Sequence, residues 1–494
     1  MDPFPHPHAS LVVAETQDVL GADELTARIA DAARKLAAAP PGPLFLGMRN
    51  DLPSVLAYLA ALRSGRPVAL LDPALPAAVL ADLTDRFAPA AVAGFQPTTA
   101  GFEPAAVAGF QPTTAGFEPT AVAGFQPTTA GFEPTAVAGF QPTTAGCEPA
   151  AVAGFAVAHR PRPRAAPDPH PDLAVLLTTS GSTGNPKLVR LSHRAVMANA
   201  RAIAQALRLT PADVAPTSLP LHYSYGLSVL NSHLAAGATI VLTGASLLER
   251  PFWRQLAEHR CTSLAGVPYQ YEMLRRLRFD PAAHPALTTL TQAGGRLRPE
   301  LVAEFAAKVD RFFVMYGQTE ATARIAVLPP ERLPDKLGSA GVALPGGALG
   351  VENGEIVYRG PNVMMGYATS AADLARGDDL GGVLRTGDLG YVDEEGFLFV
   401  TGRVKRIAKV YGVRVNLDDV ERLLRDCGPV AATGGDDRVT VWTEGLDRGA
   451  REALARRLAG ELRLHWSGFD VREVDRLPLL ATGKIDYRAL EARA

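Results

Sequence analysis

Short apolar runs that alternate with stretches of helical spacing are the feature that most constrains the fold of this chain. The first unit covers 44–76, where an apolar run Leu-Phe-Leu-Gly, a helical stretch over 52–62 and a second apolar run over 67–71 follow one another. A strand, a helix and a strand in this order form a βαβ unit, which places two parallel strands in one sheet. Similar runs recur over 238–242, 263–267, 289–294 and 312–315. The pattern predicts an α/β fold in which helices cover mostly parallel sheets.

The chain is too long for one ordinary domain, since it has 494 residues. The pattern becomes rich in strands, glycine and proline over 338–367, which predicts a small β-rich subdomain. From about residue 404 onward, short strands and helices of high charge density predict an α+β domain. We therefore predict a large N-terminal domain over 1–402 and a small C-terminal domain over 403–494.

A tandem repeat interrupts the large domain over 89–155. A fifteen-residue unit that starts Pro-Ala-Ala-Val-Ala-Gly-Phe at Pro89 recurs with small changes at Pro104, Pro119 and Pro134, and a partial copy ends it. This period is shorter than that of ordinary solenoids, and each unit offers few large apolar side chains to bury. We interpret the repeat as an insertion in which one Ala-Val-Ala-Gly-Phe segment forms a real strand.

The overall charge and the cysteines exclude several classes of protein. The 49 basic and 51 acidic residues give no polyelectrolyte surface for nucleic acid or an anionic membrane. Three scattered cysteines without metal-ligand spacing fit a reducing compartment. The first residues lack the basic start and apolar run of a signal peptide, and no apolar run is long enough for a membrane span. We expect a cytoplasmic protein.

The segment 178–187, Thr-Thr-Ser-Gly-Ser-Thr-Gly-Asn-Pro-Lys, has the composition of a phosphate-binding loop. Glycine lets backbone N–H groups approach a phosphate closely, hydroxyls donate to its oxygens, and Lys187 adds a positive charge. The spacing differs from that of a Walker A loop. The apolar run 173–177 predicts a strand before the loop, and the helical spacing over 192–207 predicts a helix after it. Taken alone, such a loop is as often an ordinary turn as a ligand site.

Four further motifs accompany this loop: Tyr-Gly-Gln-Thr-Glu at 316–320, Arg-Thr-Gly-Asp at 385–388, Gly-Arg at 402–403, and Leu-Pro-Leu-Leu-Ala-Thr-Gly-Lys at 477–484. In this order and spacing they resemble the acyl-adenylate-forming superfamily, which includes acyl- and aryl-CoA ligases, firefly luciferase and the adenylation domains of peptide synthetases. The resemblance covers about 44–490 apart from the repeat. It implies activation of a carboxylic acid by ATP to an acyl-adenylate, release of pyrophosphate, and transfer to CoA or a carrier-protein thiol.

The resemblance also implies which residues bind the nucleotide. Those of the loop would hold the ATP phosphates: Thr179, Ser180, Gly181, Ser182, Thr183, Gly184 and Lys187. Those of two other segments would contribute to the remaining nucleotide site, with the tyrosine along adenine: Gly294, Gly295, Tyr316, Gly317 and Gln318. Asp388, with Arg403 beside it, would take the ribose hydroxyls, because ionised acceptors bind hydroxyls well.

The residues that the resemblance places at the chemistry are Thr319, Glu320, Lys484 and His222. Thr319 would touch a phosphate, and Glu320 would hold Mg²⁺, a cation that prefers oxygen ligands. Lys484 would bridge the substrate carboxylate and the α-phosphate as charge develops in the transition state. His222 would belong to the wall of the acid pocket. A catalytically silent nucleotide-binding relative is disfavoured because Glu320, Asp388, Arg403 and Lys484 are retained.

Lys405 falls at the family's hinge position, about which the small mobile domain would rotate between two half-reactions. The chain departs from the family pattern at Leu188, which replaces the glycine after Pro-Lys, and at Ala408 and Tyr411, where relatives often have Ile and Lys. In thioester-forming relatives the stretch after the hinge borders the pantetheine tunnel. The acceptor therefore stays open between CoA, a separate carrier protein and a non-thiol acceptor such as an amine, with activation of nitrite as a further alternative. We expect no fused carrier domain.

The acid itself is constrained by the wall over 222–231, which contains no Asp or Glu. In relatives that activate amino acids an aspartate there pairs with the α-ammonium group, and a buried unpaired ammonium is costly. An α-amino acid is therefore disfavoured. Tyr223, Tyr225, Asn231 and Arg324 are compatible with an aryl, aryl-acrylic or polar-tailed acid, and a fatty acid also stays open.

Overall fold

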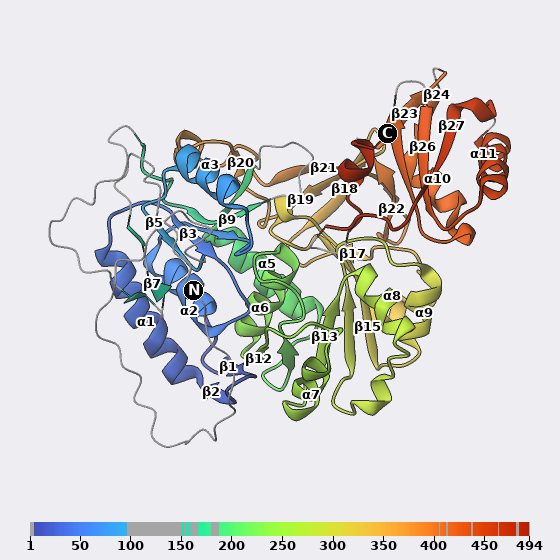
Figure 1. Ribbon diagram of the computed structural model, residues 1–494. Helices are drawn as coiled ribbons and strands as arrows, with labels where there is room; N and C mark the ends of the chain where they lie inside the picture. The colour runs from blue at the N-terminus through green and yellow to red at the C-terminus, as the bar shows by residue number, and fades with distance from the viewer. Residues whose placement is uncertain are drawn as a thin grey trace, which may run out of the picture.

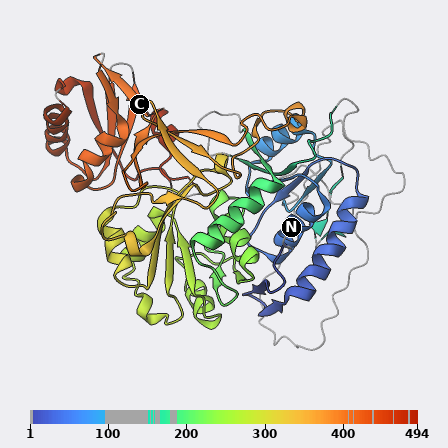
Figure 2. The same cartoon turned by 180° about the vertical axis from the view of Figure 1, so that it is seen from behind.

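The computed structural model describes residues 4–95, 151–152, 155–156, 158–159, 166–178, 187–404, 406–411, 413–435, 438–462, 464–480 and 484–493. Figure 1 shows a large α/β body from which the C-terminal part, coloured orange to red, stands out at one end. The view from behind in Figure 2 shows the same arrangement. None of the helices in these ranges has the length and hydropathy of a membrane span.

The predicted βαβ unit is present as β3 (Leu44–Gly47), α2 (Leu52–Ser64) and β4 (Val68–Leu71), and the two strands pair in parallel. The Asp51 side chain accepts the backbone N–H of Ser54, which caps the first turn of α2. Gly65 ends the helix in the left-handed region at a φ of 68°, a conformation that glycine adopts without a Cβ clash. Local sequence signals therefore determine both ends of this helix.

These strands belong to a seven-stranded sheet of order β20-β10-β9-β4-β3-β5-β8. Its other members are β5 (Ala91–Ala93), β8 (Ala158–His159), β9 (Leu173–Thr178), β10 (Leu188–Ser192) and β20 (Gly366–Ala368). The helix predicted over 192–207 is confirmed, but a strand that the sequence did not predict precedes it. The Ser/Thr/Gly-rich segment joins β9 to β10, which are antiparallel, and helix α5 (His193–Ala206) begins after β10.

The reason for this difference lies in the residues of β10. Leu188, Val189 and Leu191 are all buried against the sheet, and Arg190 forms an ion pair with Asp379. Helical spacing starts only where the Ser192 hydroxyl accepts the N–H of Ala195 and caps α5. The apolar run after the loop is thus a strand followed by a helix.

Two more sheets complete the large body. A four-stranded sheet of order β11-β12-β1-β2 contains β1 (Ser10–Val13), β2 (Asp18–Leu20), β11 (Val214–Pro216) and β12 (Thr239–Leu242). A five-stranded sheet of order β13-β14-β15-β16-β17 contains β13 (Ser263–Gly266), β14 (Thr289–Gln292), β15 (Arg311–Tyr316), β16 (Ala326–Leu328) and β17 (Val342–Ala343). The four apolar runs are strands as predicted, but the first lies in a different sheet from the other three.

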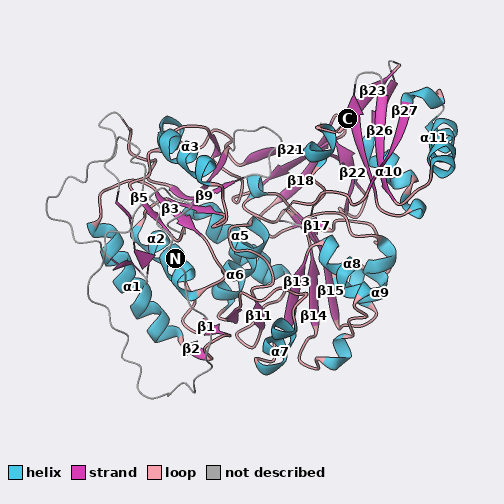
Figure 3. Cartoon of the chain, in the orientation of Figure 1, coloured by secondary structure: helices cyan, strands magenta, loops and turns pink. Residues whose placement is uncertain are grey.

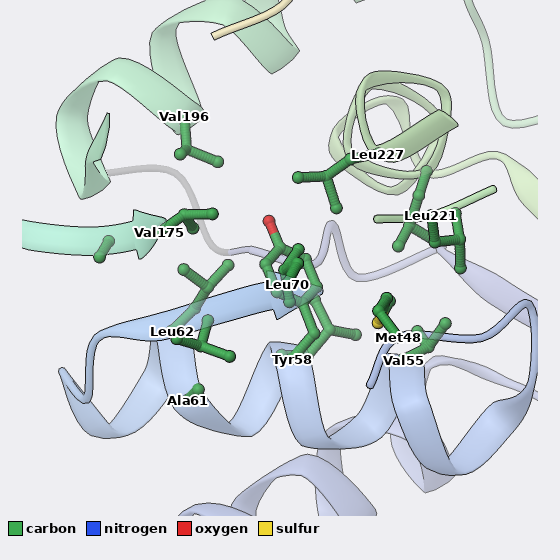
Figure 4. Close-up of a cluster of buried hydrophobic side chains, with 14 of the residues drawn as sticks. Met48, Val55, Tyr58, Ala61, Leu62, Leu70, Val175, Val196, Leu221 and Leu227 are labelled. Atoms are coloured by element: carbon green, nitrogen blue, oxygen red, sulfur yellow. The ribbon is translucent and has the colours of Figure 1, made fainter. Parts of the chain in front are cut away.

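Helices cover these sheets, as the cyan ribbons of Figure 3 show. They are α1 (Ala22–Ala38), α3 (Ala77–Phe87), α6 (Ser224–Ala236), α7 (Arg250–Glu258), α8 (Pro268–Arg276) and α9 (Pro299–Ala306), besides α2 and α5. In Figure 4, Leu70 of β4, Val175 of β9, Val55 of α2 and Leu227 of α6 belong to one cluster of buried side chains. This shared core fixes α6, which carries part of the candidate site, against the largest sheet.

The β-rich subdomain is a four-stranded sheet of order β18-β19-β21-β22, with strands β18 (Ala348–Glu352), β19 (Glu355–Arg359), β21 (Val383–Val392) and β22 (Leu398–Arg403). The C-terminal part contains β23 (Ile407–Val410), β24 (Val413–Asn416), α10 (Leu417–Leu423), β25 (Val430–Gly435), β26 (Arg438–Glu444), α11 (Arg448–Leu462), β27 (Phe469–Val474) and α12 (Tyr487–Glu491). The predicted α/β class with a β-rich subdomain and an α+β C-terminal part is confirmed. The boundary at 402–403 stays a prediction.

Most of the tandem repeat, 96–150, lies outside the described residues. The first copy does supply a host strand, since β5 pairs in parallel with β3 from Leu44↔Ala91 to Leu46↔Ala93. At the end of the repeat, β6 (Ala151–Val152) and β7 (Phe155–Ala156) form an antiparallel pair.

Deletion of residues 104–148, which are whole repeat units, is expected to change neither the melting temperature nor the turnover. The first copy still supplies β5, and loop-closure free energy changes by only about 0.6 kcal/mol for each doubling of loop length. A stepwise series lacking one, two or three units, followed by circular dichroism on heating, measures the effect. If the melting temperature falls by many degrees and the yield of soluble protein drops, the units stack and support the fold.

Candidate active site

Three side chains predicted to bind the nucleotide meet where β15 ends beside the β21–β22 pair. The Tyr316 hydroxyl donates to Asp388 Oδ2 at 2.5 Å, and Arg403 Nε lies 2.9 Å from Asp388 Oδ1. Asp388 and Arg403 are direct cross-strand partners, so the antiparallel register brings them together. The carboxylate is 5% exposed, and its negative charge raises the pKa of Tyr316 further than burial alone does. The result is an anchored anionic acceptor at the end of a sheet.

Two glycines allow the backbone to close tightly around this tyrosine and the neighbouring wall. A Cβ on Gly317 would lie 1.8 Å from the backbone oxygen of Ala323, so only glycine fits there. Gly294 has a φ of 87°, and a Cβ on it would lie 2.8 Å from the Tyr223 hydroxyl. Gly295 is adjacent, with a Cβ position 3.3 Å from Pro268. Gln318 donates to the backbone oxygen of Thr386 at 3.3 Å, which ties the segment after Tyr316 to β21.

The next residues of the motif point to a second group of polar side chains. Thr319 Oγ1 lies 3.2 Å from Ser224 Oγ at the start of α6. Glu320 Oε1 accepts the hydroxyl of Tyr367 at 2.8 Å. The ammonium of Lys187 lies 5.6 Å from the centre of the same tyrosine ring, which is within reach of a cation–π contact. Tyr367 therefore contacts both Glu320 and Lys187, the residue directly before β10. Thr319 is the neighbour of Glu320 in the chain, and a role of these three residues at the phosphates stays a prediction.

Ser224 and Tyr367 were not singled out in the sequence. Tyr367 reaches Glu320 because β20 pairs with β10, with Val189 opposite Tyr367 in the register. Glu320 and Tyr367 are 47 positions apart in the chain, and no motif connects them. Ser224 directly follows His222 and Tyr223 in the predicted pocket wall, and this position is the signal from which it could have been found.

Lys484 comes to this group from the C-terminal part of the chain. Its ammonium lies 6.0 Å from the centre of the Tyr223 ring. Partial burial, and then the charge of Arg403, lower the pKa of Lys484, while Asp388 and Glu320 act in the opposite direction. The distal motif therefore lies within electrostatic range of both the Asp388–Arg403 pair and Glu320.

His222 contacts the β3 and β4 ends of the largest sheet. Its Nδ1 lies 3.4 Å from the backbone oxygen of Met48, and its Nε2 lies 3.8 Å from Asp72 at the end of β4. Burial lowers the pKa of His222, although the Asp72 charge and the Met48 carbonyl raise it. A catalytic role for His222 stays a prediction.

The predicted acid-pocket wall is only partly as expected. Tyr223 and Tyr225 meet edge to face with ring centres 6.5 Å apart, and the Arg324 guanidinium lies 3.8 Å from the centre of the Tyr225 ring. Asn231, however, is buried on α6 and exchanges hydrogen bonds with Tyr58 of α2. Its amide is already engaged in the core between two helices, so we withdraw Asn231 as a substrate contact.

Several predicted residues lie outside the described part of the chain. They are Thr179, Ser180, Gly181, Ser182, Thr183, Gly184 and Lys405. The two departures after Lys405 are described. Ala408 is 5% exposed in the C-terminal core, whereas Tyr411 is 53% exposed and its hydroxyl lies 2.8 Å from Ser467 Oγ. The change at Ala408 therefore concerns internal packing of the small domain, and only Tyr411 alters its surface.

Known proteins resemble this chain in sequence. An indoleacetate–CoA ligase of Aromatoleum aromaticum is 34% identical over 347 residues, which are 64% of this chain and 66% of the relative. A 2-succinylbenzoate–CoA ligase of Bacillus pumilus is 34% identical over 278 residues, 53% of this chain and 56% of the relative. A luciferin 4-monooxygenase of Luciola mingrelica is 28% identical over 350 residues, 64% of this chain and 63% of the relative. Each alignment spans less than two thirds of the relative's own length.

Solved structures share the fold over nearly the whole chain. The o-succinylbenzoate CoA synthetase MenE of Bacillus subtilis, in complex with its acyl-adenylate intermediate, is 22% identical with a TM-score of 0.70, over 98% of this chain and 95% of that one. ATP-bound MatB of Rhodopseudomonas palustris is 22% identical with a TM-score of 0.71, over 99% and 96%. The profile of the AMP-binding enzyme family matches residues 6–368. This match covers most of the chain and confirms the resemblance seen in the motifs: the protein belongs to the AMP-binding enzyme family.

Proposed function

We propose that this protein activates a carboxylic acid with ATP, releases pyrophosphate, and transfers the acyl group from the adenylate to the thiol of CoA. The observation that carries the proposal is that Tyr316 and Arg403, from separate motifs, both contact Asp388, while Lys484 of the last motif lies 6.0 Å from the Tyr223 ring. Relatives named as CoA ligases for indoleacetate, 2-succinylbenzoate and oxalate support the reaction class. Because these relatives act on different acids, they do not indicate which acid this chain activates.

In the first half-reaction, a carboxylate oxygen of the acid attacks the α-phosphorus of ATP, and the bond from that phosphorus to the pyrophosphate oxygen breaks. Asp388 accepts the ribose hydroxyls and Tyr316 lies along the base, which holds the nucleotide in place. The Lys484 ammonium offsets negative charge that builds up between the carboxylate and the α-phosphate. In the second half-reaction, the thiol sulfur attacks the acyl carbon, AMP leaves with the carboxyl oxygen, and the thiol proton is released to water.

Magnesium fits the residues at the phosphate end. Glu320 is a single protein carboxylate, and only its Oε1 is recorded in a hydrogen bond, to Tyr367. No cluster of three or more His, Cys, Asp or Glu suited to a metal occurs in the part of the chain that the structure describes. One carboxylate is the protein contribution expected when Mg²⁺ takes its other ligands from phosphate and water. When bound, the ion would neutralise charge on the departing pyrophosphate, with Glu320 holding it.

Measurement of the products from ATP tests the activity. The enzyme should form AMP and pyrophosphate only when a carboxylic acid is present, and a coupled pyrophosphate assay over a panel of acids detects this. A second screen should follow acceptors, with CoA, a carrier-protein thiol, amines and nitrite in separate reactions. ADP as the product would refute the proposal. We place this activity in the cytoplasm, where the scattered cysteines are compatible with reducing conditions.

We also propose Lys405 as the pivot for rotation of residues 403–494 between the half-reactions. Lys405→Pro should slow thioester formation roughly tenfold or more and affect adenylation less, because proline fixes φ near −65° and resists the rotation. Single-turnover assays on each half-reaction, with Lys35→Ala as an exposed control, compare the two steps. Selective loss of adenylation would show that the pivot lies elsewhere.

A further inference from the structure

Arg324 is a buried cation that the proposed reaction does not use. It is 3% exposed and lies four positions after Glu320, on the segment that lines the site. A guanidinium keeps its proton in proteins and presents five N–H donors. Taking such a charge out of water costs several kcal/mol unless a counter-charge or a full set of hydrogen bonds replaces the water.

The other two buried arginines of the described chain each have several oxygen acceptors, although the Nε of Arg190 has no hydrogen-bond partner. Arg66 donates to the backbone oxygens of Leu36, Ala39, Pro40 and Gly42. Arg190 donates to backbone oxygens and forms an ion pair with Asp379. Both guanidinium groups are thus surrounded by oxygen acceptors from the protein, as structural buried arginines require.

Arg324 differs from both in its partners. Its Nε donates to the sulfur of Met315 at 3.4 Å, and sulfur is a weak acceptor. Its guanidinium stacks on the ring of Tyr225, whose hydroxyl is itself engaged by Thr291. Among the described residues, no Asp or Glu forms an ion pair with Arg324. Among the described residues, the Arg324 guanidinium therefore contacts an aromatic ring but no anionic side chain.

The backbone of Arg324 is nevertheless held firmly. Its carbonyl accepts the side-chain amides of Asn199 and Asn362, both at 2.9 Å, and its N–H donates to Asn199 Oδ1 at 3.3 Å. Asn199 and Asn362 are themselves buried. These hydrogen bonds hold the backbone of Arg324 in one position. The lack of a counter-charge for its guanidinium therefore needs an explanation.

A chain of ring contacts connects Arg324 to the reacting end. The Arg324 guanidinium lies on Tyr225, Tyr225 meets Tyr223 edge to face, and Lys484 lies over Tyr223. Each of two cations thus lies against one ring of this aromatic pair. We propose that Arg324 selects acids that carry a second anionic group, a dicarboxylic acid whose first carboxylate reacts at Lys484 and whose second forms an ion pair with Arg324. This inference rests on the proposed acid activation and specifies its substrate class.

The test uses diacids and their half-esters as matched probes: glutarate, adipate and terephthalate, each beside its monomethyl ester. Wild-type protein should show a higher kcat/KM for pyrophosphate release with a diacid than with its half-ester. Arg324→Met should lower kcat/KM for that diacid by roughly thirtyfold or more, as expected when one partner of a buried charge pair is removed. The value for the half-ester should hold or rise, and Arg324→Lys should restore part of the diacid preference. Arg448→Met, at a side chain that is 89% exposed, is the matched control.

Thermal shift keeps the test independent of turnover. A diacid with ATP present should raise the melting temperature of wild-type protein more than its half-ester does, and Arg324→Met should abolish this difference while retaining the shift caused by ATP alone. Equal treatment of diacids and half-esters by wild-type protein, in both assays, overturns the inference. The inference is also overturned if Arg324→Met lowers kcat/KM equally for diacids and half-esters. Pyrophosphate release with monocarboxylic acids alone would refute Arg324 as an anion site and leave acid activation standing, whereas no release with any acid would refute the activity.

Discussion

Lys484→Ala is expected to slow adenylation about a hundredfold to a thousandfold, the usual effect of removing one preorganised donor to a developing charge. The ammonium lies near Tyr223 and within electrostatic range of Glu320 and Asp388, so the variant removes positive charge from the point where carboxylate and α-phosphate meet. Transfer from a presynthesised acyl-adenylate to the acceptor should continue, because in the proposed reaction Lys484 serves only the first step.

Rapid-quench assays of the two half-reactions measure this separation. Pyrophosphate release with acid and ATP reports adenylation, and AMP release from added acyl-adenylate reports transfer. Lys35→Ala, an exposed lysine on α1 that pairs with Asp31, controls for the loss of one charge. Equal losses in both half-reactions would refute the assignment of Lys484 to one step.

Asp388→Asn should lower kcat/KM for ATP by about tenfold to a hundredfold, since hydrogen bonds to charged groups contribute about 1.5–3 kcal/mol each. The substitution keeps the shape of the side chain but removes the charge that pairs with Arg403 and accepts from Tyr316. An amide has one acceptor oxygen where the carboxylate has two and carries no charge, so its hydrogen bonds to the tyrosine and to a ribose hydroxyl are fewer and weaker.

The dideoxy analogue of ATP that lacks both ribose hydroxyls makes this prediction specific. Wild-type protein should discriminate strongly against the analogue, and Asp388→Asn should discriminate much less, because the lost interaction is the one that the analogue cannot make. Asp426→Asn, at an exposed carboxylate paired with Arg457, should behave as wild type. Unchanged discrimination in Asp388→Asn would place the ribose elsewhere.

The sequence predicts those parts of the fold that depend on residues close together in the chain. The βαβ unit over 44–76 could be predicted because apolar periodicity, the Asp51 cap and Gly65 all lie within one short segment. The motif residues Tyr316, Asp388, Arg403 and Lys484 could be assigned together because their order in the chain resembles that of a family, and the structure brings them together.

Contacts between distant segments could not be predicted in this way. The helix over 192–207 could be predicted, but the strand β10 before it could not, because its conformation depends on pairing with both β9 and β20. Asn231 looked like a polar pocket residue, but its partner Tyr58 is 173 positions away on another helix. The significance of Arg324 likewise emerges only once the acceptors around each buried arginine are known.

The β21–β22 pair has a consequence for how the parts of this protein could be separated. Asp388, Arg403 and Tyr316 all precede residue 404, whereas Lys484 and the proposed pivot Lys405 follow it. A fragment cut at 404 would therefore keep the contacts assigned to base and sugar while lacking the cation that drives the chemistry. In the proposed function, such a fragment would bind ATP without consuming it, so proteolysis at this point would leave a nucleotide-binding protein without activity.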